Sequence, residues 1–239
     1  MPKDRDRSYP PAPAPLPAPV ADNHTHIEPF QHFPGEELTL DQQVERAAAV
    51  GVTRLVQCGC DLEAARWTAQ VAVANPAVVG AIAVHPNEAP RLAARGAYEA
   101  GLAEIEQLAR ANPRVRAIGE TGLDFFRTGP EGRACQVQAF RDHIALAKEL
   151  GWAMQIHDRD AHGDVLAVLR GDGAPERTVF HCYSGDREMA QILAANGWYA
   201  SFAGTVTFKN SPDLREAAAS LPPALILVET DAPYLTPEP

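Results

Sequence analysis

The sequence has little lysine, few cysteines and no long apolar run. Only three of its 21 basic residues are lysine, and its four cysteines form no CxxC pair. Free thiols in a reducing compartment are therefore expected, and a cysteine-based zinc site is not. No stretch approaches the roughly 20 apolar residues of a membrane span or the continuous apolar segment of a secretion signal. These absences predict a cytoplasmic protein without membrane association.

Charge and size narrow the class further. The 239 residues carry a formal net charge of -10, and 46% of them are hydrophobic. A chain of this kind forms one large domain or two small ones, and it lacks the broad basic face of a sequence-independent DNA coat. A local basic groove remains compatible with it. Arginine supplies most of the positive charge, which suits bidentate phosphate binding but equally reflects nucleotide composition.

The chain divides into a leader and one domain. Residues 1–19 alternate proline and alanine after a charged start, which predicts a disordered polyproline-like tail. Residues 20–239 alternate short apolar runs with longer amphipathic stretches. The predicted strands are 20–25, 54–60, 78–84, 115–119, 153–157, 178–182, 198–203 and 225–229. The predicted helices are 40–50, 62–74, 97–111, 133–150, 161–169, 186–196 and 211–220. Eight such units predict an α/β protein, a (β/α)8 TIM barrel with chemistry at the carboxyl ends of its strands.

Residues of metal-ligand type recur at those strand ends. They are His24, His26, Glu120, His157, His181 and Asp231. Positions i and i+2 of a strand face the same side, so His24 and His26 can bind one ion together. Six donors exceed the needs of one open site, which favours two ions roughly 3.5–4 Å apart. Taken singly, each has another interpretation, since a strand-end histidine can be a core residue and Asp231 a helix N-cap. His32, His143 and His162 lie in a loop or in helices and are not expected to be ligands.

An ordered set of motifs resembles one family. The motifs are DNHTHIE at 22–28, AVHPNEA at 83–89, AIGETGLDFF at 117–126, QIHDRDA at 155–161, FHCYSG at 180–185, TFKN at 207–210 and ETDAPYL at 229–235. With them the chain resembles the TatD family of metal-dependent deoxyribonucleases, among the amidohydrolase-like barrels. The resemblance implies a metal centre that hydrolyses phosphodiester bonds, often from the 3′ end of single-stranded DNA. It further implies one ion at His24, His26, Glu120 and Asp231, and another at Glu120, His157 and His181.

The chemistry of these residues agrees with that implication. Many related barrels bridge two ions with a carboxylated lysine, but Lys148 falls in a predicted helix and Lys209 in a loop, which leaves Glu120 as the bridge. Water between two cations ionises near neutral pH, and Asp231 can accept its proton. Glu120 and Asp231 are thus the predicted catalytic residues. Histidine-rich ligation favours zinc, manganese, iron or cobalt, whereas magnesium prefers oxygen ligands, and the identity of the two divalent ions (Zn, Mn or Mg) stays open.

Substrate contacts are expected around the barrel mouth. Residues able to bind a phosphate are His85, Arg127, Arg159 and Ser184. Each arginine can instead form an ion pair with the neighbouring Asp124 or Asp158, and Ser184 can merely turn the chain. Phe125, Phe126 and Tyr183 can stack on unpaired bases or fill the core.

Two departures from the family pattern stand out. The sequence ends at TPEP, before the Arg-Gly and Asn-Glu-Pro segment and last helix usual in the family, so the barrel is expected to have its final C-terminal helix missing. An oligomer, a cover supplied by the leader, reduced stability or a truncated reading frame would be consistent with that. Thr121 replaces a residue that is often apolar, which is expected to alter packing only.

Three functions remain open at the level of sequence. The first is a metal-dependent 3′–5′ exonuclease on single-stranded DNA, acting as a monomer or weak oligomer. The second is a hydrolase of a carbonyl bond, such as an aminoacyl-tRNA ester, an amide or a lactone, because the same activated water attacks a carbonyl. The third is a non-catalytic interaction protein that retains its metal site.

Overall fold

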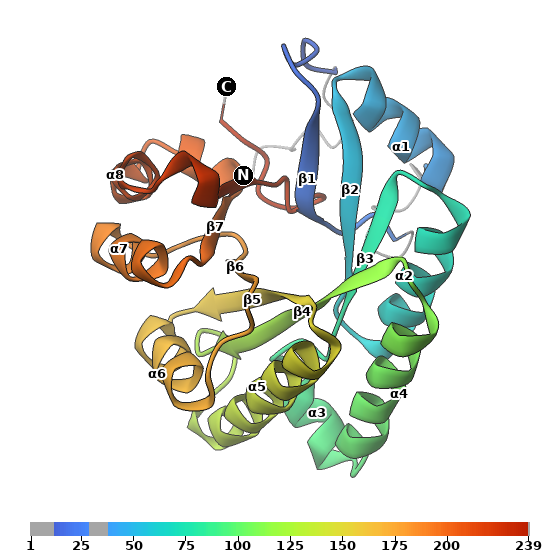
Figure 1. The fold of residues 1–239 in the computed structure, drawn as a ribbon, viewed down its shortest axis with the longest axis vertical. Helices are drawn as coiled ribbons and strands as arrows, with labels where there is room; N and C mark the ends of the chain where they lie inside the picture. The colour runs from blue at the N-terminus through green and yellow to red at the C-terminus, as the bar shows by residue number, and fades with distance from the viewer. Residues whose placement is uncertain (1–11, 29–37, 239) are drawn as a thin grey trace, which may run out of the picture.

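Eight parallel strands, in the order β1 to β8, form the centre of the molecule (Figure 1). A computed structural model describes residues 12–28 and 38–238. The strands are β1 (Val20–Thr25), β2 (Val52–Gly59), β3 (Val78–Ile82), β4 (Val115–Asp124), β5 (Ala153–Arg159), β6 (Thr178–Phe180), β7 (Tyr199–Phe202) and β8 (Ile226–Val228). This sequential order with a helix after nearly every strand is a (β/α)8 barrel, as predicted.

The helices cover the outside of this sheet. They are α1 (Leu40–Ala49), α2 (Leu62–Ala74), α3 (Ala89–Ala94), α4 (Tyr98–Ala111), α5 (Pro130–Leu150), α6 (His162–Asp172), α7 (Arg187–Asn196) and α8 (Pro212–Ser220). All seven predicted helices are present. The additional helix, α3, spans only six residues, too few for a periodic apolar pattern. The predicted start of α5 was three residues late, because Gly129 and Pro130 were not recognised as its beginning.

The barrel closes between β1 and the segment that follows β8. The backbone N–H of Asp231 donates to the carbonyl of His24 at 3.0 Å, and the N–H of His26 donates to the carbonyl of Ala232 at 2.7 Å. Asp22 in β1 accepts from the hydroxyl and the backbone N–H of Thr230, at 2.6 and 2.9 Å. In Figure 1 the red C-terminal segment accordingly passes beside the blue β1. No helix follows β8 as far as residue 238.

Apolar residues fill the layer between strands and helices. Phe140 of α5, Ile118 of β4, Met154 of β5 and Phe180 of β6 are fully buried there. Burying each such side chain contributes about 1.5–3 kcal/mol. The inner positions of the strands carry polar side chains as well, among them Gln155 of β5 and His24 of β1, which contact each other inside the barrel. This alternation puts the polar chemistry inside the barrel and leaves the apolar side to the helices.

The leader and the membrane prediction can be compared with the described residues. The backbone N–H of Leu16 donates to the carbonyl of Val50 at 3.0 Å, beside the turn from α1 to β2. The division into a tail at 1–19 and a domain at 20–239 stays a prediction.

No helix in the described ranges combines the length and the apolarity needed to cross a membrane.

Candidate metal centre

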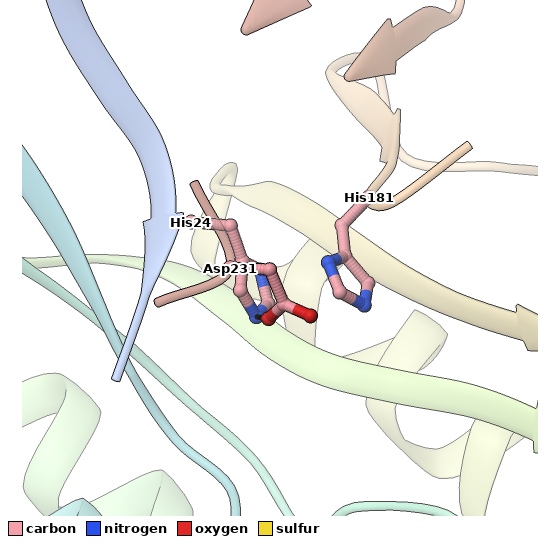
Figure 2. Close-up of side chains that lie close together, drawn as sticks. All are labelled: His24, His181 and Asp231. Carbon is pink, nitrogen blue, oxygen red and sulfur yellow. Dashed lines mark ion pairs between the residues drawn. The ribbon is translucent and has the colours of Figure 1, made fainter. Parts of the chain in front are cut away.

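The six predicted ligand residues meet at the carboxyl ends of the strands. They come from β1 and the residues directly after it, from β4 and β5, and from the segments after β6 and β8. All six line or adjoin a cleft of about 1070 Å³. Figure 2 shows that His24, His181 and Asp231 lie close together although they come from three separate segments. The rings of His24 and His181 are stacked, with centroids 3.8 Å apart.

The imidazole of His24 is held in one tautomer. Its Nδ1 lies 2.8 Å from Oε1 of Gln155. The amide of Gln155 is itself oriented, because its Nε2 donates to the carbonyl of Asn23 at 2.6 Å. Oε1 therefore accepts, and Nδ1 of His24 carries the proton. The other nitrogen, Nε2, is then a bare lone pair in the neutral ring.

The tautomer of His26 is fixed in the same way, by an acceptor on its Nδ1. Its Nδ1 lies 3.0 Å from the backbone carbonyl of Cys58, which can only accept a hydrogen bond. Its Nε2 is therefore also a lone pair, and it lies 3.2 Å from Nε2 of His24. Two buried lone pairs facing each other at this distance repel unless a cation lies between or beside them. The donor set thus fits a metal ion.

A second group forms around Glu120. Its Oε1 lies 2.8 Å from Nε2 of His181 and also contacts Nδ1 of His157, while its Oε2 lies 3.6 Å from Nε2 of His24. The two oxygens of one carboxylate thus face the two groups of histidines. Burial alone would raise the pKa of Glu120, but His181, His85 and His157 outweigh it and hold that pKa well below its usual range. Glu120 is therefore anionic and suited to bridge two cations.

The outer nitrogens of His157 and His181 also have carboxylate partners. Nε2 of His157 lies 3.2 Å from Oδ2 of Asp124, and Nδ1 of His181 lies 3.2 Å from Oε1 of Glu229. Burial lowers the pKa of His181, yet Glu120 and Glu229 together raise it well above its ordinary value. Each of the four histidines thus has one ring nitrogen fixed by an outer acceptor and the other facing the centre. This is how metal-ligating histidines are oriented in proteins.

Asp231 completes the group on the β1 side. Its Oδ1 lies 3.5 Å from Nε2 of His26 and 3.9 Å from Nε2 of His24. Burial raises the pKa of Asp231, but the neighbouring imidazoles of His26 and His181, which are positive when protonated, outweigh it, so the pKa is lowered. Its backbone is left-handed, with φ of 53°, directly after the residues that close the barrel. The carboxylate is therefore ionised and positioned by the closure itself.

His85 lies nearer to the centre than the sequence indicated. Its Nε2 is 3.5 Å from Oε1 of Glu120, and His85, Glu120 and His157 together form a group whose ligand atoms are close enough to hold an ion. Its Nδ1 accepts from the backbone N–H of Asn87 at 3.0 Å, so Nε2 carries the proton of the neutral ring. Burial lowers the pKa of His85, which keeps the ring neutral. In this tautomer it is a donor toward the cleft.

The other predicted substrate residues lie on the rim. Arg127, Arg159 and Ser184 all line the cleft. Among the described residues neither arginine forms an ion pair with Asp124 or Asp158, which was the alternative interpretation. Arg159 instead lies over the ring of Phe126, 4.1 Å from its centroid. Ser184 donates from its hydroxyl to the carbonyl of Asp158 at 3.2 Å, so it also braces the chain.

The remaining aromatic, histidine and cysteine residues are placed as follows. Tyr183 is buried and Phe125 packs against the core, whereas Phe126 is exposed. His143 is buried in α5, where its Nε2 accepts from the N–H of Val84. His162 pairs with Asp158 at 2.8 Å. His32 lies outside the described residues. All four cysteines are free.

Several functional neighbours were missed from the sequence. They are Asp124, Gln155 and Glu229. Gln155 lies two residues before His157, and Glu229 two before Asp231. The two-residue period of a strand could have indicated that both share the inward face. For Asp124, in the GLD triplet, the sequence carried no comparable signal, since its contact with His157 depends on how β4 and β5 align.

A (β/α)8 barrel with a histidine and carboxylate centre at the carboxyl ends of its strands has the architecture of a metal-dependent hydrolase. Comparison with known proteins agrees. The family model described as TatD related DNase matches residues 21–239. The chain therefore belongs to the TatD family, as its motifs indicated.

Relatives and solved structures extend this assignment. The chain is 44% identical over 224 residues to an uncharacterized metal-dependent hydrolase TatD of Mycobacterium tuberculosis, covering 92% of this chain and 82% of that protein. It is 36% identical over 204 residues to the 3′-5′ ssDNA/RNA exonuclease TatD of Erwinia billingiae, covering 82% and 74%. The crystal structure of YJJV, a TatD homolog from Escherichia coli K12, superposes with a TM-score of 0.81 at 25% identity, covering 92% of this chain and 81% of that one.

Proposed function

We propose that this protein is a metal-dependent nuclease that uses two divalent ions to remove nucleotides from the 3′ end of single-stranded DNA or RNA. The observation that carries the proposal is Glu120, whose two carboxylate oxygens face two separate groups of histidines. The name of the Erwinia relative, a 3′-5′ ssDNA/RNA exonuclease, supports the choice of substrate. The cytoplasmic location and the monomeric or weakly oligomeric state stay predictions.

The ligands divide into two sets that share Glu120. His24, His26 and Asp231 would hold one ion with it, and His157 and His181 the other. When bound, divalent ions lower the pKa of water and neutralise the charge of a phosphate. Zinc or manganese suits these nitrogen-rich sets better than magnesium.

The protein's own groups have separate tasks in this proposal. Asp231 is ionised and faces the centre, so it accepts the proton of the attacking water. His85 carries its proton on Nε2 and donates a hydrogen bond to a phosphate oxygen. Arg127, Arg159 and Ser184 line the cleft and position the nucleic acid. No protein nucleophile is needed.

The test is digestion of a single-stranded oligodeoxynucleotide labelled at its 5′ end. Metal-stripped protein is titrated with manganese, zinc and magnesium, beside the variants Glu120→Gln and Asp231→Asn. A ladder that shortens from the 3′ end, that needs metal and that is lost in both variants supports the proposal. Glu45→Gln, an exposed position on α1, is the control and should cleave like the unchanged protein.

The same titration distinguishes the alternatives. A folded protein that binds two metal ions but cleaves no nucleic acid would overturn the proposal. Hydrolysis of an aminoacyl ester or a lactone by that protein would then indicate the carbonyl chemistry. If the protein hydrolyses none of these substrates, and Asp231→Asn keeps both its fold and its binding to a partner, an interaction protein would be indicated.

A further inference from the structure

One exposed aromatic ring lies next to Arg127 and Arg159, two residues that line the cleft. Phe126, directly after β4 and its neighbour Phe125, has 62% of its surface exposed. In the described ranges only one other aromatic side chain is comparably exposed, Tyr234 at 50%. Tyr234 itself lines the cleft. An exposed ring adds little to folding stability, so its position at the mouth calls for another explanation.

The two adjacent phenylalanines have different environments. Phe125 is partly buried against the core, with the guanidinium of Arg133 4.2 Å from its ring centroid. Phe126 lies on the solvent side, where Arg159 of β5 lies over one face of its ring, 4.1 Å from the centroid. The N–H of Phe125 donates to the carbonyl of Arg159 at 2.9 Å, which fixes the two chain segments side by side. The ring of Phe126 is thus supported from one side and accessible from outside.

The charges around this ring favour a polyanion. Arg127 and Arg159 both line the cleft, and within residues 12–28 and 38–238 neither side chain forms an ion pair. The two acids next to these arginines in the sequence have other partners, since Asp124 contacts His157 and Asp158 contacts His162. In a chain with a net charge of -10, these two guanidinium groups at the mouth offer positive charge to a phosphate.

The strand order places the ring opposite the other exposed aromatic. Phe126 follows β4, whereas Tyr234 follows β8, and strands four places apart in an eight-stranded barrel lie across the mouth from each other. Glu120 and Asp231 lie in the cleft between them. A ligand that crosses the mouth would therefore meet an aromatic surface on each side of the reacting groups.

We propose that Phe126, backed by Arg159, is a stacking surface for an unpaired base of single-stranded nucleic acid, with Arg127 holding the adjoining phosphate. A base has a flat π-face whatever its identity, and the guanidinium behind the ring strengthens the surface. A base in the interior of a duplex is covered on both faces by its stacked neighbours and cannot stack there. This inference rests on the proposed nuclease function and adds to it a site that selects unpaired strands.

The test measures binding to the metal-loaded full-length protein, by fluorescence anisotropy with a phosphorothioate oligothymidylate that resists hydrolysis. Phe126→Ala should weaken binding by about tenfold, whereas Phe126→Trp, which keeps an aromatic ring, should bind like the unchanged protein. Val73→Ala, a similarly exposed hydrophobic position on α2, is the matched control. Thermal unfolding of each variant checks that the fold is retained.

Oligonucleotides with one base removed locate the contact. In the unchanged protein, removal of the base that stacks on Phe126 should weaken binding by a similar factor, and in Phe126→Ala the same removal should have no further effect. Equal binding by the unchanged protein and Phe126→Ala would overturn the stacking surface while leaving the nuclease proposal intact. No binding of any oligonucleotide by the unchanged, metal-loaded protein would overturn the proposed function and this inference together.

Discussion

Oε1 of Gln155 fixes the tautomer of His24 by accepting from its Nδ1 at 2.8 Å. The amide cannot rotate to present a donor instead, because its nitrogen already donates to the carbonyl of Asn23. The lone pair of His24 is thus directed into the barrel by a residue on another strand. Such outer partners commonly change metal affinity by 10–100-fold.

Gln155→Met should therefore weaken metal binding without removing a ligand. Methionine has a similar size but leaves His24 free to change tautomer, so we expect the affinity for one ion to fall by about 10–100-fold. Competition with a chelating dye measures this. Gln138→Met on the outer face of α5 is the control, and equal affinities in the two variants would contradict the role of Gln155.

Asp124→Asn should disturb the second ion more than the first. Oδ2 of Asp124 faces two groups that can donate, Nδ2 of Asn87 at 2.9 Å and Nε2 of His157 at 3.2 Å. An amide nitrogen in that place would meet two donors, and we expect a loss of about 1–3 kcal/mol in unfolding free energy. Metal analysis should find the stoichiometry reduced toward one ion. Asp164→Asn, exposed on α6, should retain both ions, and retention of two ions by Asp124→Asn would contradict the prediction.

Metal affinity should rise with pH. Burial lowers the pKa values of His26, His157 and His181, but nearby carboxylates outweigh it and raise all three. Because a ligand histidine must be neutral, protons compete with metal at higher pH than for an ordinary histidine, and apparent affinity should increase from about pH 6 to about pH 8. Calorimetric titration over that range measures it, and a flat profile would contradict the raised values.

The metal-free protein should have the opposite pH dependence in its stability. A histidine whose pKa is raised on folding contributes stability that is complete below the unfolded pKa of about 6.5 and is lost as pH rises through the folded value. The melting temperature of the stripped protein should therefore fall between about pH 6.5 and about pH 8. Metal-loaded protein should not follow it, since the ions replace the protons.

Gly122→Ala should be strongly destabilising. Gly122 has a φ of 139°, and a Cβ there would lie 2.1 Å from the backbone oxygen of His157. Neither strand can move without displacing a predicted metal ligand, so we expect a loss of more than about 3 kcal/mol, together with weaker metal binding. Gly163→Ala on α6, where a Cβ meets nothing within 4 Å, is the matched control. Chemical denaturation with a metal titration of each variant tests this.

The barrel was predictable because apolar residues recur at different spacings in its strands and in its helices. The runs at 54–60, 115–119 and 153–157 are short, apolar and bounded by turns, and each corresponds to a strand. The residues at which the strands end were less predictable. β4 continues to Asp124 because its last residues pair with β5, from Thr121 with Ile156 to Asp124 with Arg159. That pairing is a tertiary contact with no local signal in the sequence.

The residue types at the candidate centre were predictable, but the orientations of their side chains were less so. Strand-end positions brought His24, His157 and Asp231 together, because all parallel strands end at one face. The tautomers depended on Gln155, Asp124 and Glu229, and the position of His85 beside Glu120 depended on the loop after β3. Hydrogen bonds between residues more than 30 positions apart leave no pattern in a single sequence.

The closure of the barrel between β1 and the segment after β8 has a consequence for the order in which the protein folds during synthesis. His24 and Asp231 are joined by a backbone hydrogen bond at the closure, and their side chains adjoin the same candidate ion. During synthesis the first of these residues leaves the ribosome more than 200 residues before the second. A nascent chain can fold several βα units before Asp231, and with it the full set of candidate ligands, has been synthesised. Binding of an ion would then be a late event that links the first strand to the segment after the last.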